Sequence, residues 1–214
     1  MHADLFDGDP SESLELAPGA VLLRGFALAA QDELLAALDE IIARAPLRHM
    51  VTPGGLRMSV AMTNCGTLGW ISDRRGYRYE RNDPVHGRAW PAMPAVFSAL
   101  AKRAAAQAGF DDFVADACLV NRYEAGTRLS LHQDRDERDF SAPIVSVSLG
   151  IPATFLFGGP QRSDRTRRVP LRHGDVVVWG GPARLHHHGV LPIEADEHPL
   201  LGTYRFNLTF RKAG

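Results

Sequence analysis

The chain has 214 residues, which is enough for one domain with a sizeable hydrophobic core and leaves little sequence for a second. Hydrophobic residues make up 45% and charged residues 23%, ordinary values for a globular protein, and no apolar run is long enough to span a bilayer. The formal net charge of -1 argues against a protein that holds duplex DNA on a broad basic surface, but local arginine clusters could still bind a few phosphates.

Two helices are predicted in the first half of the chain. The first covers Gln31–Ala45, where leucine and isoleucine repeat at helical spacing and a proline follows directly. The second covers Pro94 to about Ala108, with the proline at the first helical position and Gly109 as the C-cap. The stretch between them, Val51–Trp90, has no clear period. It is predicted to form short strands and loops over the core, the kind of cover that often carries substrate contacts.

The second half is predicted to be a series of short strands separated by turns. Four segments have the length and composition of strands: Ile144–Leu149, Thr154–Phe157, Val176–Trp179 and Thr203–Arg211. Short strands at this spacing favour a sandwich or a jelly-roll barrel. The predicted fold class is therefore mostly β with flanking helices.

Two histidines and one aspartate in this β region have the composition of a metal site. His132 and Asp134 are alternate residues, so on a strand or strand end both side chains could meet one metal ion. His188 follows across several predicted strands. Two histidines and a carboxylate form the facial triad of non-haem iron(II) oxygenases. The alternatives are a polar turn beside an incidental histidine run, or a site in which His186, which shares a face with His188, is the second histidine ligand.

The last predicted strand has one apolar and one polar face. Its polar face carries Arg205, Asn207 and Arg211. Such a face needs either water or a ligand. Arginine is well suited to bidentate binding of carboxylates, so the two arginines fit a dicarboxylate such as 2-oxoglutarate, and the asparagine could hydrogen-bond one of its oxygens. The alternative is that both arginines are exposed and pair with surface acids.

Taken together, these motifs resemble the AlkB family of nucleic-acid dealkylases. The motifs are His132-x-Asp134, His188-Gly189 and Arg205-Phe206-Asn207-Leu208-Thr209-Phe210-Arg211, and residues 50–55, 58–66, 143–150 and 173–181 also resemble bacterial members. The resemblance covers nearly the whole chain, and R-x-N-x-T-x-R beside H-x-D is a specific signal. It implies one domain over residues 1–214 with a double-stranded β-helix, or jelly roll. The catalytic core would cover about 115–214, under a nucleotide-recognition lid at about 46–90.

The resemblance also implies roles for individual residues. Iron(II) would be held by the catalytic residues His132, Asp134 and His188. The cosubstrate 2-oxoglutarate would be bound by Asn121, Tyr123, Arg205, Asn207 and Arg211. Among the substrate-binding residues, Trp70 would stack on a flipped base and Asp136 would meet its exocyclic amino group, while the substrate phosphates would contact Tyr77, Tyr79 and Arg162. One departure from bacterial relatives is the pair His186-His187, which stands where they have aromatic residues.

The implied activity is oxidative demethylation of alkylated bases such as 1-methyladenine and 3-methylcytosine. It would use iron(II), 2-oxoglutarate and dioxygen, would release formaldehyde and succinate, and would amount to direct-reversal DNA repair. Alkylated single-stranded or duplex DNA is the expected partner, with RNA as a further candidate. One alternative is the same oxygenase chemistry on a protein or small molecule. A non-enzymatic binding module with a structural metal is disfavoured, because structural metal sites are normally closed.

The expected location is the cytoplasm. Residues 1–18 carry acids and no basic segment, so they lack the pattern of a secretion signal. The two cysteines, Cys65 and Cys118, are too few for a disulfide framework, and neither belongs to a CxxC pair. A reducing compartment is therefore expected. The protein is also expected to be a monomer without membrane association.

Overall fold

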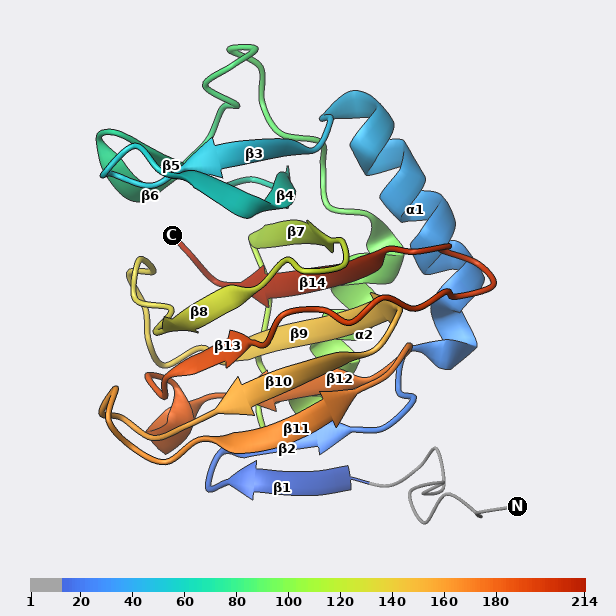
Figure 1. Ribbon diagram of the computed structural model, residues 1–214, viewed down its shortest axis with the longest axis vertical. Coiled ribbons are helices and arrows are strands. Elements are labelled where there is room, and N and C mark those ends of the chain that lie inside the picture. Colours follow the sequence, from blue (N-terminus) through green and yellow to red (C-terminus); the bar gives the residue numbers. More distant parts are fainter. Residues whose placement is uncertain (1–12) are drawn as a thin grey trace.

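The computed structural model describes residues 13–214, which form two β-sheets, a separate hairpin and two helices (Figure 1). Residues 1–12, which belong to the segment expected to lack a secretion signal, lie outside the described residues. The larger sheet has eight strands in the order β1-β2-β12-β9-β14-β7-β4-β3, and the smaller has four in the order β11-β10-β13-β8. The fold is mostly β with flanking helices, and its two antiparallel sheets make the jelly roll that the sequence predicts.

The element bounds follow the chain. The larger sheet consists of β1 (Ser13–Ala17), β2 (Ala20–Leu23), β3 (Arg48–Val51), β4 (Arg57–Gly66), β7 (Ala117–Tyr123), β9 (Ile144–Gly150), β12 (Val176–Trp179) and β14 (Arg205–Arg211). The smaller sheet consists of β8 (Leu129–His132), β10 (Ala153–Phe157), β11 (Arg167–Leu171) and β13 (His188–Val190). The hairpin consists of β5 (Gly69–Asp73) and β6 (Gly76–Glu80). All four strands predicted in the second half are therefore present: Val176–Trp179 has the predicted bounds, and the other three shift by one or two residues at one end.

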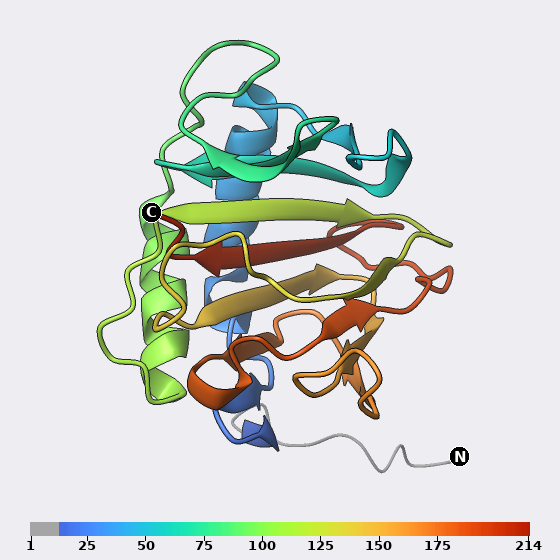
Figure 2. The same cartoon turned by 90° about the vertical axis from the view of Figure 1, so that its left-hand side faces the viewer.

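Both predicted helices are confirmed. α1 spans Gln31–Arg44 and α2 spans Ala95–Gln107, and both cover the outer face of the larger sheet (Figure 2). Pro94 is the N-cap of α2 instead of its first helical residue, because its ψ of 146° is extended. Gly109 follows α2 with a φ of +87°, a left-handed conformation that glycine adopts at no steric cost.

Two hydrophobic cores lie on opposite faces of the larger sheet. The core under the helices includes Phe97 and Phe210, whose rings meet edge to face at 5.8 Å. The core between the two sheets includes Phe155 and Trp179. Because successive side chains of a strand point to opposite faces, β14 sends its apolar residues to the helices and its polar residues between the sheets. Arg205 is only 1% exposed, so the alternative of arginines on the surface is wrong.

The stretch predicted to lie over the core divides into two parts. β4 is built into the larger sheet, where it pairs with β7 over Ala61–Gly66. It lacks a clear period because residues 60–65 are all buried. A strand buried on both faces does not show the alternation of apolar and polar residues that marks a half-exposed strand. The β5–β6 hairpin and the loop that leads to α2 are the parts that stand outside the main sheets. The expected cover over the site therefore comes mainly from this hairpin.

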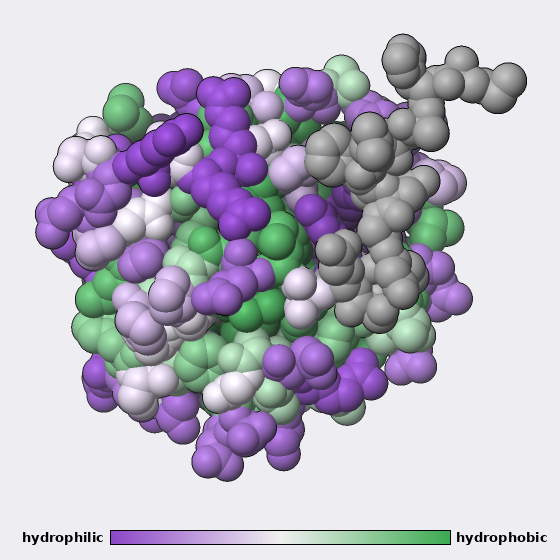
Figure 3. Space-filling model, turned by 90° about the horizontal axis from the view of Figure 1, so that it is seen from below, coloured by the Kyte–Doolittle hydropathy of each residue, from purple (hydrophilic) through white to green (hydrophobic). Residues whose placement is uncertain are grey.

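The exterior mixes polar and apolar side chains. Seen from the β1 end, hydrophilic side chains surround a smaller apolar area (Figure 3). Such mixing is ordinary for a folded protein surface. Within residues 13–214, neither α1 nor α2 has the length and apolar character that crossing a bilayer requires.

Candidate active site

Three potential metal ligands meet at the ends of two neighbouring strands of the smaller sheet. β8 ends at His132, which lies opposite His188 in β13, and Asp134 follows β8 by two residues. His132 Nε2 is 3.7 Å from Asp134 Oδ1, and His188 Nε2 is 3.6 Å from Asp134 Oδ2. The ligand atoms of all three residues lie within 4.8 Å of one another. The fold therefore brings together the two histidines and the carboxylate that the sequence singles out.

Backbone carbonyls orient both imidazoles. His132 Nδ1 is 2.9 Å from the Ser130 carbonyl oxygen, and His188 Nδ1 is 3.0 Å from the His186 carbonyl oxygen. Since a carbonyl oxygen can only accept, each Nδ1 carries the proton and each Nε2 keeps a free lone pair toward Asp134. This is the usual arrangement of metal-binding histidines. Burial, with a smaller contribution from His188, lowers the pKa of His132 to about 4, so this ring is neutral near pH 7.

The rival histidine is directed elsewhere. The ring of His186 packs against Phe157, with 5.5 Å between ring centroids, and His186 is not a member of the three-residue group. Its backbone carbonyl instead orients His188. The geometry thus favours His188 over His186 as the second histidine ligand.

Arg211 keeps the aspartate ionised. Its Nη2 and Nε donate to Asp134 Oδ2 at 2.8 and 3.2 Å. Burial by itself would raise the pKa of Asp134, but the charge of Arg211, the largest opposing influence, holds the pKa well below its usual range. Asp134 is therefore a carboxylate, the form that binds a cation.

Arg205 is a buried cation with unused donors. Its Nη2 donates to Ser148 Oγ at 3.0 Å, and its guanidinium carbon lies 4.9 Å from the centre of the Tyr123 ring. Its Nε and Nη1 are buried and have no hydrogen-bond partner among residues 13–214. Burial lowers the pKa of this guanidinium. A buried charge without its hydrogen bonds is costly, so the site fits an anion such as a carboxylate.

The other residues predicted to bind 2-oxoglutarate share this face of the sheet. Asn121 and Tyr123 of β7 lie opposite Asn207 and Arg205 of β14 in the strand register. The Asn207 amide nitrogen already donates to Ser146 Oγ at 2.7 Å and to the Val147 carbonyl at 3.0 Å. The five predicted residues thus form one buried strip that runs from Arg205 to Arg211 beside the aspartate.

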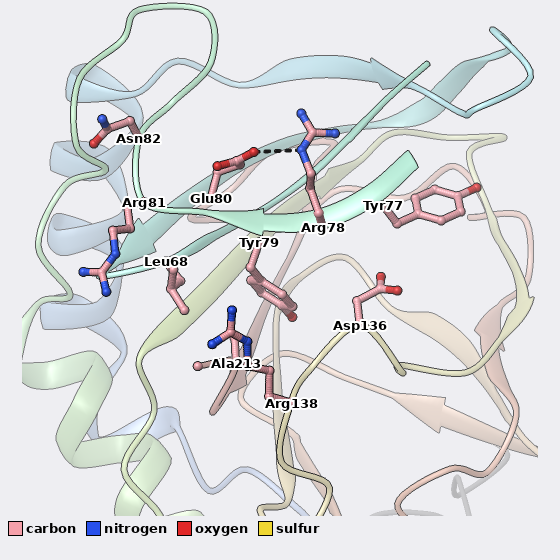
Figure 4. Close-up of a pocket in the computed structure, with 11 residues that line it drawn as sticks. Leu68, Tyr77, Arg78, Tyr79, Glu80, Arg81, Asn82, Asp136, Arg138 and Ala213 are labelled. Carbon is pink, nitrogen blue, oxygen red and sulfur yellow. Dashed lines mark hydrogen bonds and ion pairs between the residues drawn. The ribbon is translucent and has the colours of Figure 1, made fainter. Parts of the chain in front are cut away.

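Three of the predicted substrate residues meet at the mouth of the site. Trp70 Nε1 donates to Asp136 Oδ2 at 2.8 Å, and the Trp70 ring stacks on Tyr77 at 5.6 Å with an angle of 13° between the planes. Figure 4 shows Asp136 below the β6 strand that carries Tyr77. Arg162 Nη1 donates to the Leu131 carbonyl at 2.6 Å, next to His132. The two predicted base contacts therefore lie together with Tyr77, and Arg162 lies beside the strand that ends at His132.

Sequence reasoning missed a buried carboxylate that links the hairpin to the metal site. Glu137 accepts from the Tyr79 hydroxyl at 2.6 Å and from Arg184 Nη2 at 3.0 Å, and its Oε1 is 3.3 Å from Arg211 Nε. Burial, opposed by Arg211, raises the pKa of Tyr79 well above its usual value. Nothing local distinguishes Glu137 from a solvated acid of the turn, because its partners come from distant parts of the chain.

We expect Tyr79→Phe to destabilise the protein, because it removes a hydrogen bond to a buried carboxylate. The loss should be about 1.5–3 kcal/mol in free energy of unfolding, measured by chemical denaturation. Tyr77→Phe is the matched control on the same strand face. Since 47% of Tyr77 is exposed, its change should stay within about 0.5 kcal/mol. Equal losses in the two variants would contradict a special role of the Tyr79–Glu137 bond.

Both the sequence and the structure are similar to known proteins. Residues 19–211 match the sequence profile of the 2OG-Fe(II) oxygenase superfamily. Alpha-ketoglutarate-dependent dioxygenase AlkB of Escherichia coli (strain K12) is 56% identical over 212 residues, which cover 99% of this chain and 98% of that protein. Nucleic acid dioxygenase ALKBH1 of Homo sapiens is 34% identical over 124 residues, which cover 58% of this chain and 31% of that protein. The structure is similar to that of OsALKBH1, with a TM-score of 0.81 at 30% identity over 94% of this chain and 100% of that one.

Proposed function

This chain belongs to the 2OG-Fe(II) oxygenase superfamily, and on that premise we propose that it is a dioxygenase that oxidatively demethylates alkylated bases in DNA. The observation that carries the proposal is the His132–Asp134–His188 group beside the buried Arg205. The 56% identity to AlkB over nearly the whole of both chains supports the same activity. The products are the repaired base, formaldehyde and succinate, so the reaction is a direct reversal of DNA damage.

The residues present fit both iron(II) and 2-oxoglutarate. The two imidazoles and the carboxylate would hold iron(II), since they are the donor set of a facial triad. Arg205, with its two unused donors, is placed to bind the carboxylate of 2-oxoglutarate farther from the metal, and Arg211 lies at the metal end. The remaining contacts to 2-oxoglutarate are assigned to Asn121, Tyr123 and Asn207. When bound together with dioxygen, iron(II) and 2-oxoglutarate supply the oxidation of a substrate C–H bond, with release of succinate and carbon dioxide.

The protein itself orients the substrate and limits the access of water. Trp70 stacks on the extruded base, and Asp136 accepts a hydrogen bond from its exocyclic amino group. A carboxylate and aromatic rings also attract positively charged bases such as 1-methyladenine and 3-methylcytosine. The rings of Trp179 and Phe155 pack against the His188 ring, with 4.8 and 6.0 Å between ring centroids. These two rings exclude water from the side of His188 on which they lie. Phosphate contacts are assigned to Tyr77, Tyr79 and Arg162.

The net charge of the protein bears on whether single-stranded or duplex substrates are preferred. With a net charge of -1, the grip on phosphates is local. Extruding a base costs a few kcal/mol, and less when the strand is already single. We therefore expect single-stranded methylated oligonucleotides to be turned over at least as well as duplex, with RNA as a second substrate.

The experiment that tests the function measures succinate and formaldehyde together. A methylated and an unmethylated oligonucleotide of the same sequence are compared in the presence of iron(II) and 2-oxoglutarate. The proposal expects formaldehyde from the methylated strand alone, in amounts equal to the additional succinate. Succinate release that no methylated strand stimulates would instead favour a hydroxylase of proteins or small molecules.

The organisation of the working protein is part of the proposal. We assign residues 1–214 to one domain that acts as a monomer, with the nucleotide-recognition lid at about 46–90 and the catalytic core at about 115–214. A cytoplasmic location is supported by Cys65 and Cys118, which lie opposite each other in the β4–β7 register as buried free thiols. A reducing compartment keeps such a pair reduced.

Trp70→Ala should weaken the turnover of methylated DNA without unfolding the protein. It removes base stacking worth roughly 1–3 kcal/mol, and Trp70 is only partly buried. Trp90→Ala provides the contrast, because Trp90 is 4% exposed and its loss should cost about 3–5 kcal/mol of stability. Steady-state kinetics and thermal unfolding on both variants measure the two effects. Several kcal/mol of lost stability in Trp70→Ala would make this tryptophan a packing residue.

A further inference from the structure

A groove of about 770 Å³ adjoins the proposed base site on the far side of Asp136. It lies below β6, between the loop that follows β8 and the chain end that follows β14 (Figure 4). Tyr77 and Asp136 line its end near the base site, and Arg81 and Arg138 are among the residues that line the remainder. The groove is therefore continuous with the place where the extruded base would sit.

The β6 segment presents two tyrosines and an arginine to this groove. Tyr77, Tyr79 and Arg81 are alternate residues, and Figure 4 shows them on the groove side of the chain. Alternate residues of an extended chain are about 6.6 Å apart. The Tyr79 hydroxyl is engaged by Glu137, so the ring is the part of Tyr79 that the groove can use. An aromatic ring followed by a cation is the combination with which proteins bind single strands.

Arg81 and Arg138 differ from Arg78, the third arginine that lines the groove. The side chains of Arg81 and Arg138 are exposed and make no ion pair or hydrogen bond with any residue in 13–214. Arg78 also lines the groove, but its guanidinium is paired with Asp73 and Glu80, each at 2.8 Å. The same ion pair neutralises the Glu80 carboxylate, which lines the groove as well. The end of the groove farther from Asp136 is therefore cationic, and its cations are available to a ligand.

We propose that this groove binds the phosphodiester backbone of the substrate strand immediately beside the target nucleotide. Arg81 and Arg138 hold its phosphates, and the ring of Tyr79 lies beside the same stretch of backbone. The positive charge excludes a basic peptide, and the continuity with the base site favours the same strand over a separate ligand. This inference rests on the proposed function, because it names the part of that substrate which lies outside the base pocket.

The test compares two double variants that remove the same charge. Arg81→Ala with Arg138→Ala alters the groove, and Lys102→Ala with Arg103→Ala is the control on the exposed face of α2. Fluorescence anisotropy measures binding of the metal-free proteins to a single-stranded oligonucleotide with one 3-methylcytosine, from low to moderate salt. The groove variant should bind roughly three- to tenfold more weakly at low salt. Its log–log salt slope should be shallower by about 1.4, since each phosphate contact on a single strand contributes about 0.7. The control should match the wild type.

A second pair of probes separates a local contact from general attraction. The 3-methylcytosine is placed at the 5′ end of one oligonucleotide and at the 3′ end of another, and 3-methylcytidine monophosphate serves as a substrate without flanks. The groove variant should lose affinity for only one of these two oligonucleotides, because the groove lies on one side of the target nucleotide. It should turn over the mononucleotide at the wild-type rate. An unchanged salt slope, equal losses for both oligonucleotides, or an equal loss on the mononucleotide would overturn the groove assignment. Failure of the wild type to release formaldehyde from the methylated strand would contradict the proposed function instead.

Discussion

Replacing His188 with alanine should abolish demethylation, whereas His186→Ala should leave substantial activity. His188 Nε2 lies 3.6 Å from Asp134 Oδ2, while the His186 ring packs on Phe157. Removing one of three protein ligands leaves two, which is too few to fix the geometry of a facial iron site. His132→Ala and Asp134→Ala should be inactive for the same reason.

The two histidine variants are compared by activity and by metal binding. Formaldehyde release reports turnover, and calorimetric titration with iron(II) under anaerobic conditions reports the site itself. His186→Ala keeps the backbone carbonyl that orients His188, so its iron affinity should stay close to that of the wild type. His187→Ala should behave in the same way. An inactive His186→Ala beside an active His188→Ala would show that the assignment of the second histidine is wrong.

Replacing Arg205 with alanine should raise the KM for 2-oxoglutarate steeply. Arg205 is 1% exposed, and two of its donors have no partner among the described residues. Leaving a carboxylate without its buried partner costs roughly 2–5 kcal/mol, which corresponds to a loss of affinity of about 30-fold or more. Iron(II) binding should change little, because Arg211 and not Arg205 contacts Asp134.

Two further variants make the Arg205 result specific. Arg122 belongs to the neighbouring strand, and its guanidinium lies over the Tyr204 ring and pairs with Glu124. The KM of Arg122→Ala for 2-oxoglutarate should therefore match that of the wild type. Arg205→Lys keeps the charge but loses the planar fork, so its KM should fall between those of wild type and Arg205→Ala. Wild-type affinity for 2-oxoglutarate in Arg205→Ala would remove this residue from the site.

Features that are encoded in neighbouring residues could be predicted from the sequence alone. The two helices follow from the spacing of apolar residues and from their prolines, and the alternation of β14 predicted one apolar and one polar face. Both depend on a periodicity that the backbone imposes locally. The residue types of the candidate metal site could also be found, because His132 and Asp134 are close in sequence and the motifs resemble a known family.

Other features depend on contacts between distant segments, so only the tertiary structure decided them. β4 could not be recognised as a strand of the main sheet, because burial on both faces removes the alternation that marks a half-exposed strand. The buried Glu137 is defined by Tyr79, Arg184 and Arg211, which are far from it in the chain. His186 and His188 are equivalent in a sequence pattern, and the pairing of β13 with β8 is what places His188 opposite His132. Short-range periodicity can thus be read from the sequence, because it depends on neighbouring residues. The partners of a buried polar group cannot, because they depend on which strands lie side by side in the fold.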